Sequence, residues 1–264
     1  MRITTLIENT SCGDSFASEH GISLLIETGK HKILFDAGQS DAFARNAEKL
    51  GVDLRDVDFA VLSHGHYDHG GGLTRFLEIN EKAPVYVNCH AFEEHFHGAD
   101  RYIGLDCRLK ESGRILFAGD ECRVDEGITL YSGNGRETVT PVDSSGLCVK
   151  KDGVLCPEDF CHEQYLMVEE DGMRCLFSGC SHRGILNIMH WFAPDVLVGG
   201  FHFKDIALDD AGRERLRKAA EALLGYRSVY YTGHCTGMEQ YRFLKELMGD
   251  ELHYISAGSV ISLE

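Results

Sequence analysis

The chain has 264 residues, and its content of 43% hydrophobic and 26% charged residues is typical of a folded globular protein. Acidic residues outnumber Lys and Arg by 42 to 26, and the net charge of −16 disfavours binding to the phosphates of nucleic acid. No apolar run approaches the roughly 20 residues that span a bilayer, and residues 1–10 lack the features of a secretory signal peptide. We therefore expect a cytoplasmic protein without a nucleic-acid or membrane partner.

The ten cysteines include no CxxC pair, the spacing that is typical of zinc ribbons and redox motifs. They also do not resemble the dense disulfide framework of a small secreted domain. Most of them are therefore expected to be reduced thiols, which again favours the cytoplasm.

Short apolar runs in the first third of the chain predict strands at residues 2–8, 22–28, 32–35 and 58–63. Helices are expected at residues 41–50 and after residue 68. The Gly-rich region 84–153 is expected to form strands and loops, part of which lies beside a site.

The last hundred residues alternate between strand and helix patterns. Strands are predicted at residues 165–169, 174–178, 196–199, 228–232 and 253–256. A helix is predicted at 213–224, with one apolar stripe and a stop at Gly225. A second helix is predicted to run from Thr236, which has capping-box spacing with Glu239, to residue 248. This alternation indicates one α/β assembly.

The most informative motif follows the apolar strand at 58–63 and contains three imidazoles and a carboxylate within six residues: His64, His66, Asp68 and His69. Burying these groups without partners would be costly, and imidazole and carboxylate are ligands of zinc, iron and manganese. In an extended chain His64 and His66 point the same way, whereas Asp68 and His69 come from the following turn. The spacing therefore predicts two adjacent metal ions.

Residues 64–69 match the HxHxDH signature, and the chain resembles the metallo-β-lactamase superfamily along its whole length. The resemblance also includes LFDAG at 34–38, LFSGC at 176–180 and YTGH at 231–234. It implies a four-layer αββα sandwich in a single domain, 1–264, with pseudo-symmetric halves of about 1–160 and 161–264. It also implies that His234 is a metal ligand, that Asp36 orients a ligating imidazole, and that Cys180 takes the place of the usual Asp ligand.

One further ligand is needed for the first metal, and the sequence offers His162 and His182. His162 lies at the mouth of a predicted strand, 18 residues before Cys180, and His182 lies two residues after it. The phrase GCSHRGI at 179–185 resembles a branch of metal-dependent hydrolases that includes dihydropterin–ribofuranosylaminobenzene-phosphate synthases. Either histidine, or both, is expected at the metals.

Other residues are candidates for contacts with a substrate. His202 follows a predicted strand at the metal edge and is a candidate proton donor, and Arg183 and Lys204 are candidate contacts for an anionic substrate. His20 is a further candidate from the first hairpin. A group of three histidines is interpreted as surface or lid residues on a short helical stretch: His90, His95 and His97.

These expectations define a metal-dependent hydrolase, in which a metal-bound water with a pKa lowered toward about 7 attacks the substrate. Asp68 is expected to hold the second metal and to orient that water. The Cys180 thiolate favours zinc, with iron and manganese as alternatives. Family resemblance suggests a small anionic substrate of the phosphoester or pterin-linked phosphate class.

Two other functions are compatible with these motifs. The first is an iron-dependent oxidoreductase, although the di-iron branch of this fold has Glu where this chain has His66, and no flavin domain is evident. The second is a non-catalytic metal-binding or sensory protein, in which no coordination position is open.

Overall fold

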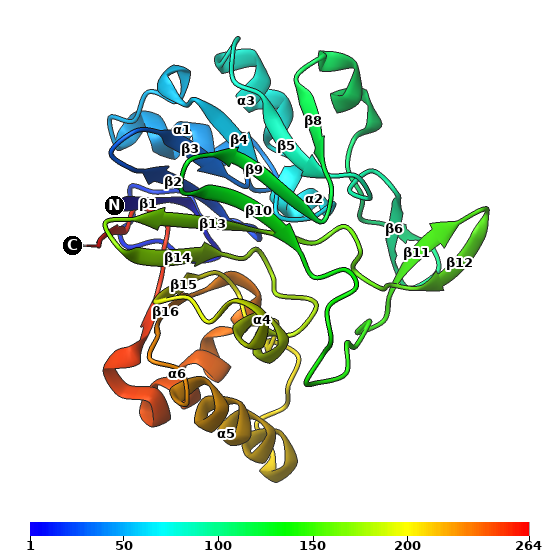
Figure 1. The fold of residues 1–264 in the computed structure, drawn as a ribbon, viewed down its shortest axis with the longest axis vertical. Helices are drawn as coiled ribbons and strands as arrows, with labels where there is room; N and C mark the ends of the chain where they lie inside the picture. The colour runs from blue at the N-terminus through cyan, green and yellow to red at the C-terminus, as the bar shows by residue number, and fades with distance from the viewer. Residues whose placement is uncertain (264) are drawn as a thin grey trace.

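Two seven-stranded sheets lie face to face in the computed structural model, which describes residues 1–263 (Figure 1). In spatial order, the first sheet consists of β18 (Val260–Ser262), β1 (Arg2–Ile7), β2 (Ser23–Glu27), β3 (Lys32–Phe35), β4 (Phe59–Val61), β5 (Val85–Asn88) and β8 (Ile115–Ala118). The second sheet consists of β17 (Leu252–Tyr254), β16 (Val229–Thr232), β15 (Val196–Val198), β14 (Met173–Phe177), β13 (Gln164–Glu170), β10 (Ile128–Ser132) and β9 (Glu121–Asp125).

The two sheets share one pattern of strand pairing. In each sheet, three antiparallel pairings on one side are followed by three parallel pairings on the other. The expected division near residue 160 does not coincide with the division between sheets, because β9 and β10 already belong to the second sheet. The last strand, β18, returns to the first sheet beside β1.

Helices form the two outer layers (Figure 1). The helices on the side of the first sheet are α1 (Ala42–Lys49), α2 (Tyr67–Gly70) and α3 (Leu73–Ile79), and those on the side of the second are α4 (Ile185–Phe192), α5 (Asp210–Leu224) and α6 (Met238–Met248). Short 3-10 turns occur at η1 (Leu54–Asp56), η2 (Cys107–Ser112), η3 (His234–Thr236) and η4 (Gly249–Glu251). Within residues 1–263, no helix has the length and apolar character of a transmembrane span.

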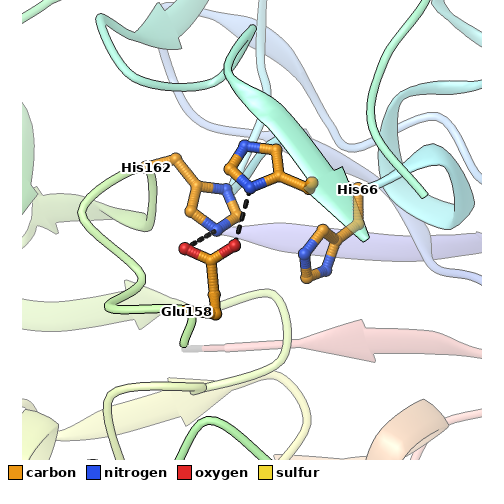
Figure 2. Close-up of side chains that lie close together, drawn as sticks. His66, Glu158 and His162 are labelled. Carbon is orange, nitrogen blue, oxygen red and sulfur yellow. Dashed lines mark hydrogen bonds and ion pairs between the residues drawn. The ribbon is translucent and has the colours of Figure 1, made fainter. Parts of the chain in front are cut away.

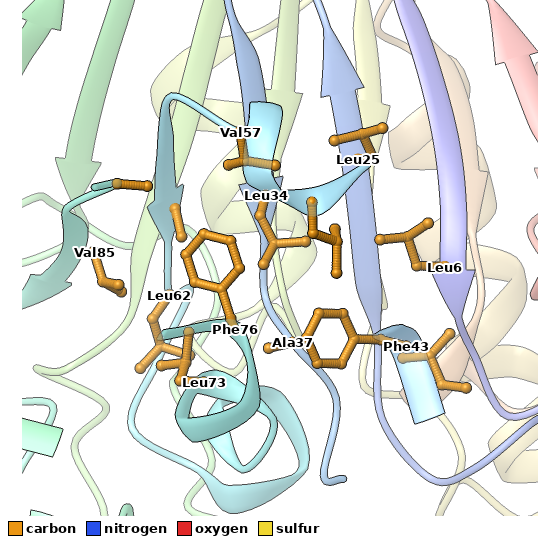
Figure 3. Close-up of a cluster of buried hydrophobic side chains, with 14 of the residues drawn as sticks. Leu6, Leu25, Leu34, Ala37, Phe43, Val57, Leu62, Leu73, Phe76 and Val85 are labelled. Carbon is orange, nitrogen blue, oxygen red and sulfur yellow. The ribbon is translucent and has the colours of Figure 1, made fainter. Parts of the chain in front are cut away.

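The central strands are apolar on both faces because each face packs against another layer. Leu34 of β3 faces α1 and α3, where it joins Phe43 and Phe76 (Figure 3), while its neighbour Phe35 faces the second sheet. On the other sheet, Leu176 of β14 packs toward the outer helices. The continuous apolar runs that predicted these strands therefore form three stacked core layers.

The region between β5 and β13 contains a small third sheet that projects beside the sandwich (Figure 1). Its strands are β12 (Val154–Pro157), β11 (Leu147–Lys151), β6 (Glu94–His97) and β7 (Arg101–Tyr102). The prediction of a short helical stretch for His90, His95 and His97 is wrong, because His95 and His97 lie in strand β6. Pairing with β11 and β7 on both sides holds this segment in the extended form.

The predicted capping box of α6 is also wrong. Gly237, with φ of 82°, precedes the helix, and no side chain caps it. The Thr236 hydroxyl instead accepts a hydrogen bond from the backbone N–H of Phe201 at 2.9 Å. Tertiary contacts therefore use the hydroxyl that the local pattern assigned to the helix.

Candidate metal centre

The residues of the site come from the carboxyl ends of strands in both sheets. Asp36 follows β3 and His64 lies shortly after the parallel strand β4 in the first sheet. Cys180 and His234 lie just after β14 and β16, which flank β15 in the parallel part of the second sheet. Because the carboxyl ends of parallel strands meet at one edge, these side chains converge between the two sheets.

Four side chains have the spacing of ligands around one ion. Nε2 of His69 lies 3.3 Å from Nε2 of His234 and 3.2 Å from Sγ of Cys180. Oδ2 of Asp68 lies 3.4 Å from Nε2 of His234 and 3.8 Å from Nε2 of His69. Ligands bound at about 2.0–2.3 Å to a tetrahedral ion are separated by about 3.3–3.8 Å. The donor set therefore fits a divalent transition metal.

A second set of buried nitrogens lies beside the first. The ligand atoms of His64, His66 and His182 lie within 4.8 Å of one another. Within residues 1–263, Nε2 of His64, Nε2 of His66 and both ring nitrogens of His182 are buried without a hydrogen-bond partner. Leaving such atoms unsatisfied is costly, and a metal ion among them would remove that cost.

Asp36 controls the tautomers of one imidazole in each set. Its Oδ2 lies 2.6 Å from Nδ1 of His69, so a neutral His69 carries its proton on Nδ1 and presents the Nε2 lone pair to a metal. The same oxygen accepts the Ser63 hydroxyl at 2.7 Å. With its only proton donated to Asp36, the Ser63 oxygen accepts from Nδ1 of His64 at 2.8 Å, which leaves Nε2 of His64 with a lone pair.

His234 is oriented in the same way by residues for which the sequence offered no signal. Oδ1 of Asn9 lies 2.8 Å from Nδ1 of His234, so Nε2 again presents a lone pair. Oε1 of the buried Glu8 accepts the backbone N–H of His234 at 2.5 Å. Both residues follow β1, which no recognised motif marks as part of the site.

His162 belongs to a different cluster, shown in Figure 2. Its Nδ1 accepts the backbone N–H of Gly65 at 2.8 Å, so a neutral His162 carries its proton on Nε2, 3.7 Å from Oε1 of Glu158. Nδ1 of His95 lies 2.7 Å from Oε2 of Glu158. Ligand atoms of these residues and His66 lie within 4.8 Å of one another, and within residues 1–263 the Nε2 atoms of His95 and His162 are buried without a hydrogen-bond partner. Because Nδ1 of His162 accepts a backbone proton, its Nε2 carries a proton rather than a lone pair in the neutral form. The interpretation of His95 as a surface or lid residue is wrong, because it is fully buried.

A cavity of about 630 Å³ opens over the candidate ligands. Among its lining residues are His20, His202, Lys204 and Arg215. Nε2 of His20 lies 3.3 Å from Oδ2 of Asp68, and the rings of His202 and His182 have centroids 4.4 Å apart. Arg215, on α5, was not identified from the sequence because it lies in a charged helical stretch that resembles a solvated face.

Arg183 does not have the position expected of a substrate contact. Its guanidinium donates to Oδ1 of Asn134 at 3.0 Å and to the carbonyl of Asp159 at 3.2 Å. It also lies 5.9 Å from the Trp191 ring, and it is absent from the walls of the cavity. These neighbours hold the guanidinium of Arg183 outside the cavity.

The enclosed site favours neutral imidazoles. Burial lowers the pKa of His66 to about 3 and the pKa values of His64 and His182 well below the ordinary range. His69 is the exception: burial lowers its pKa, but the carboxylates of Asp36 and Asp68 outweigh burial and raise it to about 9. Burial also raises the pKa of the Cys180 thiol, so a bound metal is needed to form its thiolate.

The chain belongs to the metallo-beta-lactamase superfamily, whose family model matches residues 20–225. It is 30% identical over 288 residues to the 7,8-dihydropterin-6-methyl-4-(beta-D-ribofuranosyl)-aminobenzene-5'-phosphate synthase of Methanocaldococcus jannaschii, covering 99% of this chain and 96% of that protein. It is also similar to the solved structure of Tm1679, described as a metal-dependent hydrolase of the beta-lactamase superfamily, with 29% identity, a TM-score of 0.79, and coverage of 100% and 99% of the two chains.

A more distant match is Zn(2+)-bound PqqB of Methylobacterium extorquens, with a TM-score of 0.60, 11% identity and full coverage of both chains, which supports the fold alone. The family match and the Tm1679 structure confirm the predicted superfamily and its αββα sandwich.

Proposed function

We propose that this protein is a metal-dependent hydrolase of a small anionic substrate of the phosphoester class. The observation that carries the proposal is the pair of adjacent buried ligand sets at the floor of an open cavity. The name of the Methanocaldococcus jannaschii relative, which describes a phosphate-bearing molecule, supports a phosphate-containing and pterin-linked substrate. The ten cysteines are all free thiols, which supports a cytoplasmic location.

One metal would be held by His64, His66 and His182, and the other by Asp68, His69, His234 and the Cys180 sulfur. His182 is preferred over His162 because both ring nitrogens of His182 are free, whereas Nδ1 of His162 accepts a backbone proton. Soft sulfur favours zinc over the alternatives iron and manganese. The bound ions would supply an activated water and polarise the scissile group.

The surrounding residues orient the substrate and the attacking water. Asp68 lies on the cavity wall, and its carboxylate would hold the second metal and accept a hydrogen bond from that water. The pKa of His202 is lowered to about 4 by burial and by Lys204, so its neutral imidazole would donate a hydrogen bond, rather than a proton, to the leaving group. Lys204 on the same wall would attract the anionic group.

The test is an activity panel on zinc-loaded protein: aryl phosphomonoesters and phosphodiesters, a carboxylic ester, and nitrocefin. We expect phosphoester hydrolysis that falls at least 100-fold in His182→Ala and is unchanged in His190→Ala, a matched histidine variant on the exposed face of α4. Efficient nitrocefin turnover without phosphoester hydrolysis would contradict the proposal. If no substrate of the panel is hydrolysed, the second candidate is a bond-forming reaction on the same centre, which the synthase relative favours.

A further inference from the structure

A second cavity of about 620 Å³ continues from the first on the far side of His182 and His202. The two cavities share five lining residues: Asp143, Ser145, His182, His202 and Arg215. His182 and His202 therefore separate the metal centre from a second chamber, which lies between the loop at 140–145 and helices α4 and α5.

The walls of the second chamber differ in character from those of the first. Seven apolar side chains line it: Pro141, Ile185, Leu186, Phe201, Phe203, Ala211 and Ala219. The first cavity is lined mainly by imidazoles and charged groups. A chamber of this volume and character suits the apolar ring system of a small molecule.

The charged side chains at the mouth of the chamber differ in whether they already have a partner. Glu214 forms ion pairs with Arg217 and Lys218 on the surface of α5. Asp143 accepts the backbone N–H of Ser145 at 2.9 Å. Arg215, at the junction of the two cavities, has no ion-pair partner within residues 1–263, and Lys204 lies on the wall of the first cavity. Arg215 at the junction and Lys204 on the wall of the first cavity are therefore available to an anion on a ligand that spans both spaces.

We propose that the substrate is a two-part molecule whose apolar ring system lies in the second chamber and whose anionic group lies at the junction beside Arg215 and the metals. This inference takes the reaction, hydrolysis at the metal centre, from the proposed function. The shape of the substrate is inferred from the chamber alone and does not depend on which bond is broken. A simple inorganic or alkyl phosphate would leave the chamber empty.

The test is calorimetric binding to full-length, zinc-loaded protein with two phosphonates that a hydrolase cannot cleave at carbon: methylphosphonate and 1-naphthylphosphonate. We expect the naphthyl compound to bind at least tenfold more tightly. Ala211→Trp places an indole at the exposed entrance of the chamber and should remove most of this difference, whereas Ala222→Trp, exposed on the same helix outside both cavities, should preserve it.

Reversing the charge of Arg215 provides a second test, which does not require a bulky side chain in the chamber. Arg215→Glu should weaken binding of both phosphonates at least tenfold, whereas the exposed Arg227→Glu should leave it unchanged. Equal affinity for the two phosphonates, or equal effects of the two tryptophan variants, would overturn the inference. If naphthylphosphonate binds tightly but no ester is hydrolysed, the inference about the chamber stands and the proposed function is wrong. If esters are hydrolysed but the two phosphonates bind equally well, the proposed function stands and the inference about the chamber is wrong.

Discussion

Asp36 lies beneath both candidate metal positions, and its two oxygens accept three hydrogen bonds. Oδ1 accepts the backbone N–H of Ser63 at 2.7 Å, and Oδ2 accepts from Ser63 Oγ and His69 Nδ1. A single carboxylate therefore determines the proton positions on His64 and His69, one in each ligand set. This role differs from metal binding, because the residue acts through its neighbours.

Replacing Asp36 with Asn should reverse both tautomers. An amide N–H directed at Nδ1 of His69 would move the imidazole proton to Nε2, and the Ser63 hydroxyl would then donate to His64 rather than accept. We expect the zinc affinity of both sites to fall by about 10–100-fold. Competition with a chromophoric chelator would measure the two steps separately. Ser63→Ala is the matched variant, and it should weaken only the step that involves His64; equal loss in both steps would contradict this assignment.

At the scale of the elements, four turns that follow strands share one backbone feature. Asp36 after β3, Ser181 after β14, His202 after β15 and His234 after β16 have φ values of 56°, 57°, 54° and 48°. This left-handed conformation is uncommon outside glycine, and such residues cluster at functional sites where the surrounding structure holds them. Each turn redirects the chain directly after a strand, so that the polar residues there lie between the sheets.

The strands themselves follow from sequence because their signal is local. Residues 32–35 and 174–178 are apolar runs, and β3 and β14 form there within one residue. The turns after them were not predictable, since His202 and His234 adopt a conformation that their residue type disfavours. The burial of His95 was not predictable for a related reason: its partner, Glu158, lies 63 residues away in the sequence. The motif residues 64–69 were evident because their chemistry is concentrated in one short segment.

Glu163 holds the turn after β14 in place. Its buried carboxylate accepts the backbone N–H groups of His182 at 2.7 Å and Arg183 at 3.0 Å, together with the Tyr165 hydroxyl at 2.7 Å. Burial raises the pKa of this carboxyl despite these donors.

Glu163→Gln should release the turn, because the amide has only one acceptor oxygen. Its NH2 group would face one of the groups that now donate to the carboxylate, and that donor would lose its acceptor. We expect a loss of about 1–3 kcal/mol in the free energy of unfolding, measured by urea denaturation. Zinc binding at the set that contains His182 should weaken while the set that contains His234 is preserved. The more exposed Glu170→Gln serves as the control, and an equal effect of both variants would show that Glu163 does not position His182.

At the scale of the whole molecule, the stability of the metal-free protein should depend on pH in two opposed ways. The lowered pKa values of the buried His64 and His182 give stability that is present above the unfolded value of about 6.5 and is lost as the pH falls below it. The raised pKa of His69, about 9, gives stability that is present below about 6.5 and is lost as the pH rises through 9.

The Tm of the chelated protein should therefore be highest near neutral pH and fall on both sides. Calorimetry between about pH 5 and pH 9.5 would measure this profile. In His69→Gln the alkaline decline should be reduced while the acid decline remains. A Tm that is constant across this range would contradict the protonation states inferred for the site.

Metal removal tests how the two halves of the sandwich are joined. His64, His66, Asp68 and His69 follow strands of the first sheet, whereas His182 and His234 follow strands of the second, so each ion would bind ligands from both. An ion that binds only the folded state stabilises it by about 4 kcal/mol when its free concentration is a thousandfold above Kd. We expect a chelator to lower the Tm at pH 7 by at least about 10 °C, with reversal by zinc. In a double variant, His182→Ala with His234→Ala, the same treatment should have little effect. An unchanged Tm after verified zinc removal from the native chain would show that the ions do not join the sheets.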